Sequence, residues 1–235
     1  MTPIGTVAAL RRYPVKSTAA EDLQQASLFW TGLQGDRTYA FAQAENRTDF
    51  PWLTGRQVAD LVRYVARYDG PDPKHAALTV TVPDGTAWDI RDPALLQHMA
   101  ERAGRPVQLV RMGRGTYDAM PVSVLTGRQV DAIGAAHGAP VGAERFRANI
   151  LLDLDADAPP DAAWMGRELC VGPIARMRLD WAIPRCGMVA IHPGTGAKDP
   201  SVVQTVVEAF GNRVGTYCAV TAPGPLAVGD RVALA

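Results

Sequence analysis

Closely spaced glycines and prolines divide this sequence into short apolar runs. The chain of 235 residues contains 22 glycines and 18 prolines, about one residue in six compared with roughly one in eight in average proteins. Because these residues make turns and end regular elements, few elements can be long. The opening of the chain fits this pattern, with predicted strands at residues 4–13, 26–30 and 37–43. We therefore expect a β-rich α+β fold with short helices.

Local signals place several further elements. Pro83-Asp84-Gly85-Thr86 separates residues 77–82 from 87–90, which predicts a hairpin because glycine supplies the positive φ of a tight turn. Asp92-Pro93 predicts a helix start, and Gly104 the end of that helix. Further helices are expected at 126–137 and 200–210, and further strands at 107–111, 149–154, 168–171, 174–179, 217–221 and 231–234.

Charge and composition exclude two classes of protein. The 24 basic residues equal the 24 acidic ones, whereas general nucleic-acid binding needs a basic surface. No apolar run approaches the roughly 20 residues that span a bilayer, and the first residues lack the apolar core of a leader peptide. The three cysteines form no CxxC pair, which favours a reducing compartment. We expect a soluble cytoplasmic protein that binds neither nucleic acid nor membrane.

The segment Met112-Gly113-Arg114-Gly115-Thr116 has the composition of a linker. We therefore predict two domains, residues 1–115 and 116–235. Among the later loops, residues 181–200 are rich in glycine, proline and arginine and are expected to carry chemistry.

Several common catalytic motifs are missing from the sequence. The four histidines make no HxxH or HxxxH pair, and no GxxxxGK[ST] or GxSxG segment occurs. What remains is a set of cations at turns and strand ends: Lys16, Arg37, Arg56, Arg147 and Arg185. If they converge, they would bind a phosphorylated cofactor, because arginine captures phosphate bidentately. Each arginine taken alone is more typical of a solvated surface than of a binding site.

Cys186 differs from the other cysteines. Cys170 and Cys218 lie in alternating strand patterns typical of core residues, whereas Cys186 follows Pro184-Arg185 in the loop segment. An adjacent guanidinium favours the thiolate, which is the form that binds metal or attacks a substrate. Cys186 is therefore the candidate for a reactive or metal-ligating thiol.

These residues form part of an ordered series that runs nearly from end to end of the chain. The series comprises Tyr13-Pro14-Val15-Lys16-Ser17, Gly35-Asp36-Arg37, Phe146-Arg147, Asn149-Ile150, Trp164, Arg185-Cys186, Thr195-Gly196, Gly215, Tyr217 and Val228-Gly229-Asp230. It resembles the MOSC family, named after the C-terminal domain of molybdenum cofactor sulfurase, including its N-terminal β-barrel domain. Within that superfamily the sequence is most similar to the amidoxime-reducing component proteins and their bacterial relatives.

The resemblance implies an N-terminal MOSC β-barrel domain packed on a C-terminal MOSC β-barrel domain, with the molybdenum cofactor (Mo-molybdopterin) bound between them. Cys186 would be the thiolate ligand of the metal. Lys16, Ser17, Arg37 and Arg147 would hold phosphate and pterin. The same pocket would include Asn149, Arg185 and Tyr217, and we assign Arg56 to the cofactor-binding set as well.

Two departures from the family pattern accompany this resemblance. Where relatives often have Asp-Thr-Ser-Pro, this chain has Asp118-Ala119-Met120-Pro121, so two hydroxyl groups are absent, and Ala148 replaces a proline. Some relatives carry a ferredoxin domain after the last barrel strand, whereas this sequence ends at Ala235. We therefore expect a separate electron donor, a ferredoxin-like or cytochrome b5-like protein.

The resemblance leads to a primary functional hypothesis and two alternatives. The primary hypothesis is an oxidoreductase that cleaves the N–O bond of N-hydroxylated small molecules, with Asp118 as a candidate proton donor. The first alternative is a sulfur carrier or molybdenum cofactor carrier that uses Cys186. The second is an interaction module that keeps the barrel without a cofactor.

Overall fold

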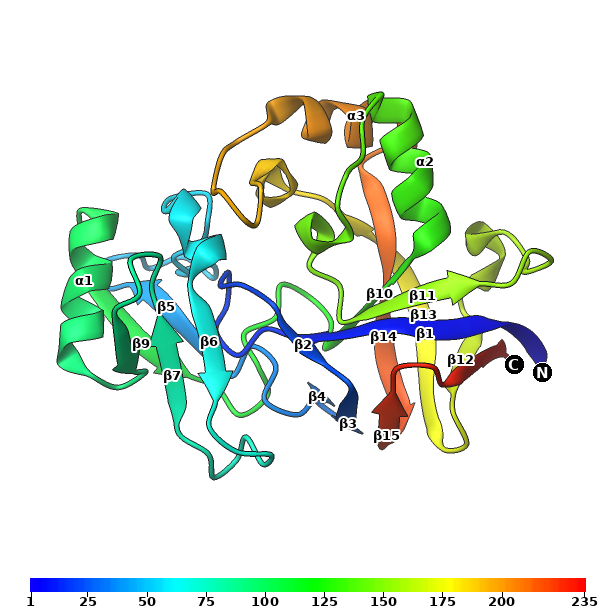
Figure 1. The fold of residues 1–235 in the computed structure, drawn as a ribbon, viewed down its shortest axis with the longest axis horizontal. Coiled ribbons are helices and arrows are strands. Elements are labelled where there is room, and N and C mark those ends of the chain that lie inside the picture. Colours follow the sequence, from blue (N-terminus) through cyan, green and yellow to red (C-terminus); the bar gives the residue numbers. More distant parts are fainter.

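A closed β-barrel is the largest unit of the fold, which a computed structural model describes for residues 1–235 (Figure 1). Around the barrel the strands follow the order β11, β10, β14, β13, β12, β16 and β1, and a further pairing of β11 with β1 closes the ring. The bounds are β1 (Thr2–Arg12), β10 (Val122–Thr126), β11 (Ile150–Leu154), β12 (Glu168–Val171), β13 (Ala175–Pro184), β14 (Arg213–Ala222) and β16 (Arg231–Leu234).

Barrel closure depends on the first strand of the chain. β1 pairs antiparallel with β16 on one side and with β11 on the other, so the N-terminal strand lies between strands from the second half of the sequence. The pairing register shifts at Gly5, whose φ is +148° and whose backbone lies against Asp153 of β11. Side chains such as Ile4, Trp164 and Leu169 fill the barrel interior.

A second, smaller unit is built from two short sheets, one α-helix and one 3₁₀ helix. Its elements are β5 (Tyr39–Gln43) paired with β9 (Val107–Arg111), the sheet β6 (Val65–Tyr68), β7 (Leu78–Thr81) and β8 (Ala87–Asp89), the 3₁₀ helix η1 (Ala59–Arg63) and α1 (Pro93–Ala103). They enclose a core of their own that includes Phe41, Leu53, Leu61 and Tyr64. Figure 1 shows this unit on the left and the barrel strands on the right.

The remaining elements join or cover these two units. They are β2 (Glu21–Leu23), β3 (Gln25–Phe29), β4 (Gly32–Leu33), α2 (Gly127–His137), η2 (Ala143–Phe146), η3 (Asp161–Trp164), η4 (Gly187–Ala190), α3 (Pro200–Phe210) and β15 (Gly224–Ala227). α2 links the parallel strands β10 and β11, as a parallel connection requires. α2 and α3 lie together on one side of the barrel over a third core that contains Ile133, Phe146 and Val206 (Figure 1).

The structure confirms the prediction of a β-rich α+β fold with short helices. The hairpin around Gly85 forms, with φ +92° at that glycine. α1 begins after Asp92, whose side chain accepts a hydrogen bond from the Ala94 N–H, and ends at Gly104 in the left-handed conformation. The segment 37–43 is shorter than predicted, because Arg37 takes a left-handed conformation and β5 starts only at Tyr39.

The division at residues 115 and 116 stays a prediction. The chain does leave the small unit after β9, and residues 112–121 lead to the barrel strand β10. However, β1 is a barrel strand and β3 pairs with β15. The N-terminal segment therefore contributes strands to the barrel as well as to the smaller unit. No helix in the fold is both long and apolar enough to cross a membrane.

Gly5→Ala tests the dependence of the barrel on the close approach of β1 and β11. A Cβ at this position would lie 2.0 Å from the Asp153 carbonyl oxygen, and the backbone φ of +148° disfavours any side chain. We expect the free energy of unfolding to fall by about 3 kcal/mol in urea denaturation. The control is Gly113→Ala, where nothing lies within 4 Å and φ is not positive. Equal stabilities of the two variants would contradict the proposed close approach.

Candidate functional site

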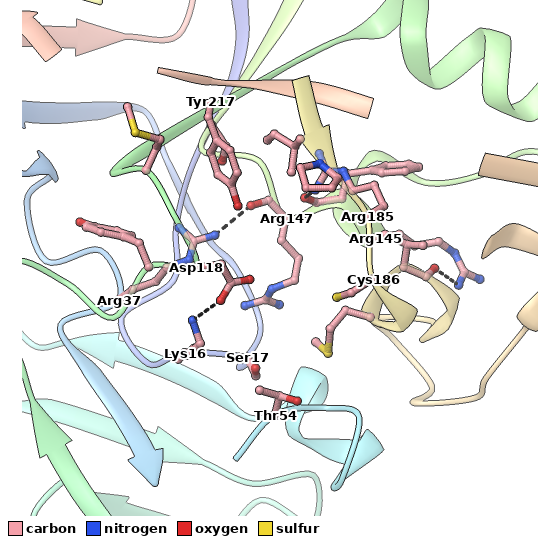
Figure 2. A pocket seen from close by; sticks show the side chains of 18 of the residues that line it. Lys16, Ser17, Arg37, Thr54, Asp118, Arg145, Arg147, Arg185, Cys186 and Tyr217 are labelled. Atoms are coloured by element: carbon pink, nitrogen blue, oxygen red, sulfur yellow. Dashed lines mark hydrogen bonds and ion pairs between the residues drawn. The ribbon is translucent and has the colours of Figure 1, made fainter. Parts of the chain in front are cut away.

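A cavity of about 460 Å³ opens between the barrel and the smaller unit. The ten residues singled out from the sequence all line it: Lys16, Ser17, Arg37, Arg56, Asp118, Arg147, Asn149, Arg185, Cys186 and Tyr217. They come from segments that are far apart in the sequence, and Figure 2 shows most of their side chains directed into one space. The fold therefore brings the predicted set together, while the role of each residue stays a prediction.

Backbone hydrogen bonds join three loop segments at the cavity floor. The Lys16 N–H donates to the Tyr39 carbonyl at 2.8 Å, and the Arg37 N–H donates to the Tyr13 carbonyl at 2.7 Å. The Thr116 N–H and hydroxyl both donate to the Arg37 carbonyl, at 2.7 and 2.9 Å. These bonds fix the positions from which Lys16, Arg37 and Asp118 reach the cavity.

Left-handed backbone conformations concentrate at the cavity. Apart from glycines, only four residues have positive φ: Ser17 (70°), Arg37 (47°), Arg147 (53°) and Asn212 (60°). The first three line the cavity, and the Asn212 carbonyl accepts the Arg185 N–H at 3.1 Å. Such conformations cost free energy and persist where the surrounding contacts hold them, often at functional sites.

The buried Asp36 carboxylate connects the strands beneath the cavity. Its oxygens accept the Tyr13 N–H at 2.7 Å, the Asn149 side-chain amide at 3.1 Å, and an ion pair with Arg37. The Asp36 side chain is completely buried. A buried charge of this kind is tolerated because each oxygen is hydrogen-bonded and a cation lies beside it.

The Tyr13 ring supports two of the cations. The guanidinium carbons of Arg37 and Arg147 lie 4.6 and 4.3 Å from its ring centre, within the range of cation–π contact. The Arg37 guanidinium also donates to the Arg147 carbonyl at 3.0 Å. Two like charges are thus held close together, an arrangement that favours a bound anion.

Two buried guanidinium nitrogens lack any partner in the protein: Nη2 of Arg147 and Nη2 of Arg185. Arg185 is fixed by its other nitrogens, which donate to the Val214 and Phe146 carbonyls at 2.8 Å each. Gly215 leaves room for the free nitrogen, since a Cβ there would lie 2.8 Å from it. Burial lowers the pKa of both arginines to about 10, so they stay charged at neutral pH. A buried unpaired donor is costly unless a ligand satisfies it.

Lys16 and Asp118 form an ion pair at the wall of the cavity. Lys16 Nζ donates to Asp118 Oδ1 at 2.6 Å and to the Thr116 carbonyl at 2.5 Å (Figure 2). Burial lowers the pKa of Lys16, and the Asp118 charge partly opposes this effect. Burial alone would raise the pKa of Asp118, but Lys16 brings it below its ordinary value. Asp118 is therefore ionised at neutral pH, and the proton of the pair resides on Lys16.

Cys186 is the residue before η4, is separated from the end of β13 by Arg185, and is exposed. Its side chain points into the same space as the Arg147 guanidinium (Figure 2). Met188, two residues later, packs against Gly55, where a Cβ would lie 3.0 Å from the thioether sulfur. Gly55, and with it the neighbouring Arg56, therefore packs against η4, the short helix that follows Cys186. Cys170 and Cys218 are buried, as predicted.

Asn149 and Arg56 are held differently from the other cavity residues. The Asn149 amide is used within the protein: its oxygen accepts the Ser123 N–H and hydroxyl at 3.1 and 3.0 Å, and its nitrogen donates to the Arg11 carbonyl at 3.2 Å and to Asp36. It therefore supports the site structurally. Arg56 is exposed, and its guanidinium lies 5.3 Å from the Phe50 ring without a carboxylate partner.

Sequence reasoning did not single out several other lining residues. Arg145, whose guanidinium donates to the Val189 and Ala190 carbonyls at 3.2 and 2.9 Å, adds a sixth cation. Phe50 and Met188 supply apolar surface. Only the fold brings Arg145 and Phe50 to the cavity, and nothing in the sequence distinguishes Met188, although it lies two residues after Cys186. Asp36 belongs to the Gly35-Asp36-Arg37 motif that the sequence analysis named. Only the structure shows that its side chain is buried and paired with Arg37.

The lining side chains therefore include six cations and a single carboxylate, that of Asp118, although the whole chain has no net charge. Such a concentration of positive charge attracts an anionic ligand. The adjacent thiol is a soft ligand of the type that binds molybdenum, copper or zinc. The chemistry of the donor set thus fits a phosphorylated cofactor that contains a metal.

Comparisons with known families cover almost the whole chain. The family model described as MOSC domain matches residues 109–233, and the one described as MOSC N-terminal beta barrel domain matches residues 4–120. No curated protein matches the sequence.

Among solved structures, the YuaD protein of Bacillus subtilis is similar over 98% of this chain and 95% of its own, with 16% identity and a TM-score of 0.52. The YiiM protein of Geobacillus stearothermophilus covers 49% of this chain and 54% of its own, with 17% identity and a TM-score of 0.39. At these identities the similarity to YuaD concerns the fold alone.

Asp36→Ala tests the buried network beneath the cavity. Its loss leaves the Arg37 guanidinium without its carboxylate, and we expect the free energy of unfolding to fall by roughly 3–5 kcal/mol. The control is Asp22→Ala, which removes an exposed partner of Arg11 and should cost about 1 kcal/mol or less. Urea denaturation measures both. A small, equal loss in the two variants would contradict the structural role of Asp36.

Proposed function

This chain belongs to the MOSC domain family, and on that basis we propose that it is an oxidoreductase that binds the molybdenum cofactor and reduces N-hydroxylated small molecules. The observation that carries the proposal is the pair of buried, unpartnered guanidinium nitrogens of Arg147 and Arg185 in a cavity that contains the exposed Cys186 thiol. These groups fit a ligand with a phosphate and a soft metal centre.

The residues divide the binding task between them. Arg147 and Arg185 each offer a free nitrogen to an anionic group. The Arg37 guanidinium donates a hydrogen bond to the Arg147 carbonyl and so holds Arg147 at the cavity. Ser17 lines the same cavity. Ala119 and Met120 provide no hydroxyl groups. Capture of the phosphate therefore depends on the cations, and the Cys186 thiolate would bind the metal.

Reduction of an N-hydroxylated compound consumes two electrons and two protons and releases water. When bound, the cofactor supplies a metal that can deliver the two electrons. The electrons would reach it from a separate ferredoxin-like or cytochrome b5-like protein. Lys16 holds a proton at its hydrogen bond to Asp118, so this pair, rather than Asp118 alone, is suited to supply protons at neutral pH.

An alternative role as a sulfur or cofactor carrier rests on the exposure of Cys186. A carrier thiol must reach both its donor and its acceptor. A wild-type protein that reduces no N-hydroxylated compound, and whose Cys186 carries one additional sulfur by mass spectrometry, would favour the carrier.

Cys186→Ser tests the proposed enzyme. Because serine is a hard oxygen ligand in place of a soft thiolate, we expect turnover of an N-hydroxylated substrate to fall by on the order of 100-fold or more. The matched control is Cys170→Ala, at a buried strand position outside the cavity, which should retain activity. Circular dichroism checks that both variants are folded. Unchanged turnover in Cys186→Ser would rule out the proposed role of the thiol.

A further inference from the structure

We propose that the substrate of this site carries an anionic group, such as a carboxylate, and that Arg56 binds this group beside Cys186 instead of binding the cofactor, as expected from the sequence. This inference rests on the proposed function and specifies the class of substrate.

The charge balance of the cavity favours an anionic substrate in addition to the cofactor. Six cationic side chains line it, and the carboxylates of Asp36 and Asp118 are paired with Arg37 and Lys16. A phosphate monoester would add roughly two negative charges. Arg147 and Arg185, with their buried free nitrogens, are the residues placed to receive it. The two cations that remain uncompensated are Arg56 and Arg145.

Arg56 and Arg145 both lie close to the short helix η4. Arg145 is anchored to η4 through the Val189 and Ala190 carbonyls. Arg56 follows Gly55, which packs against Met188 of the same short helix. Both cations are therefore associated with the helix that begins directly after Cys186.

Arg56 is accessible to a ligand in the cavity. The Arg56 side chain makes no ion pair, and its only polar partner is the Thr54 hydroxyl, 3.4 Å from Nε. Its terminal nitrogens are free, and the residue is exposed. Arg147 and Arg185, by contrast, are half-buried, and one guanidinium nitrogen of each is fully buried. A substrate that enters the cavity would meet Arg56 without displacing any protein contact.

The side chains near Arg56 also indicate the chemical character of the uncharged part of the substrate. The Phe50 ring lies 5.3 Å from the Arg56 guanidinium and 5.4 Å from Lys16 Nζ. Met188 and Val189 add apolar lining on the side of η4. This combination of an aromatic face with a free guanidinium suits a flat aromatic molecule that bears a carboxylate.

The test compares two substrates that differ only in charge, 4-(hydroxyamino)benzoate and 4-(hydroxyamino)benzamide, with cofactor-loaded wild-type protein. It measures kcat and KM for both, and the dissociation constants of their amine products, 4-aminobenzoate and 4-aminobenzamide, by calorimetry. One charge-assisted contact predicts a preference of roughly 10-fold or more for the anion. This preference should appear in KM and in product binding.

The variants are Arg56→Gln and, as a matched control, Arg67→Gln, an exposed arginine of β6 outside the cavity. Arg56→Gln should reduce the preference to about threefold or less, and Arg67→Gln should leave it intact. Pterin content is measured in each variant so that cofactor loss is recognised.

Equal binding of the two amine products by the wild-type protein would overturn the inference, and so would a preference that persists in Arg56→Gln. If neither hydroxyamino compound is reduced, the proposed function fails. Product binding still reports separately on whether Arg56 recognises the anion.

Discussion

The Asp36 carboxylate holds together the part of the structure on which the site depends. It is completely buried and binds the Tyr13 backbone, the Arg37 guanidinium and the Asn149 amide. Tyr13 follows β1 of the barrel, Arg37 precedes β5 of the smaller unit, and Asn149 precedes β11. One carboxylate thus joins both units at the base of the cavity. Its negative charge also makes it possible to bury Arg37 close to Arg147.

The positive charge above this network is only partly neutralised by the protein. Asp36 and Asp118 compensate Arg37 and Lys16, whereas Arg147 and Arg185 keep buried nitrogens without partners. The left-handed backbone conformations of Ser17, Arg37 and Arg147 also reduce the stability of the folded protein. These unpaired nitrogens and strained residues destabilise the ligand-free folded protein. An anion that binds only the folded state would stabilise that state. The molybdenum cofactor, through its phosphate, would supply that anion.

The sequence predicted much of the fold where the signals are local. α1 is bounded by Asp92 and Gly104, and the hairpin by Gly85, because capping and turn geometry depend on neighbouring residues. β10 was not predicted. Its five residues are all buried and show no alternation, and such a short run cannot be assigned by periodicity. The position of β1 between β11 and β16 was also unpredictable, since it depends on pairing with distant strands.

The residues of the site could be predicted from an ordered set of motifs, but their relationships could not. The sequence contains no signal that Asn149 is used within the protein, that Asp118 is paired with Lys16, or that Arg145 binds the Ala190 carbonyl. Each of these contacts joins segments that only the folded chain brings together. The contrast between Cys186 and the buried Cys170 and Cys218 was predictable, because strand alternation distinguishes core positions from a loop.

We propose that the unpartnered cations hold a molybdenum cofactor. This binding is tested most directly by measuring molybdenum by elemental analysis and pterin by fluorescence after oxidation, in wild-type protein and in Arg147→Ala, both produced in a host that makes the cofactor. The account predicts near-stoichiometric molybdenum and pterin in the wild type and a loss of roughly 10-fold or more in occupancy in the variant. Wild-type protein without pterin, or equal content in the two proteins, would contradict it.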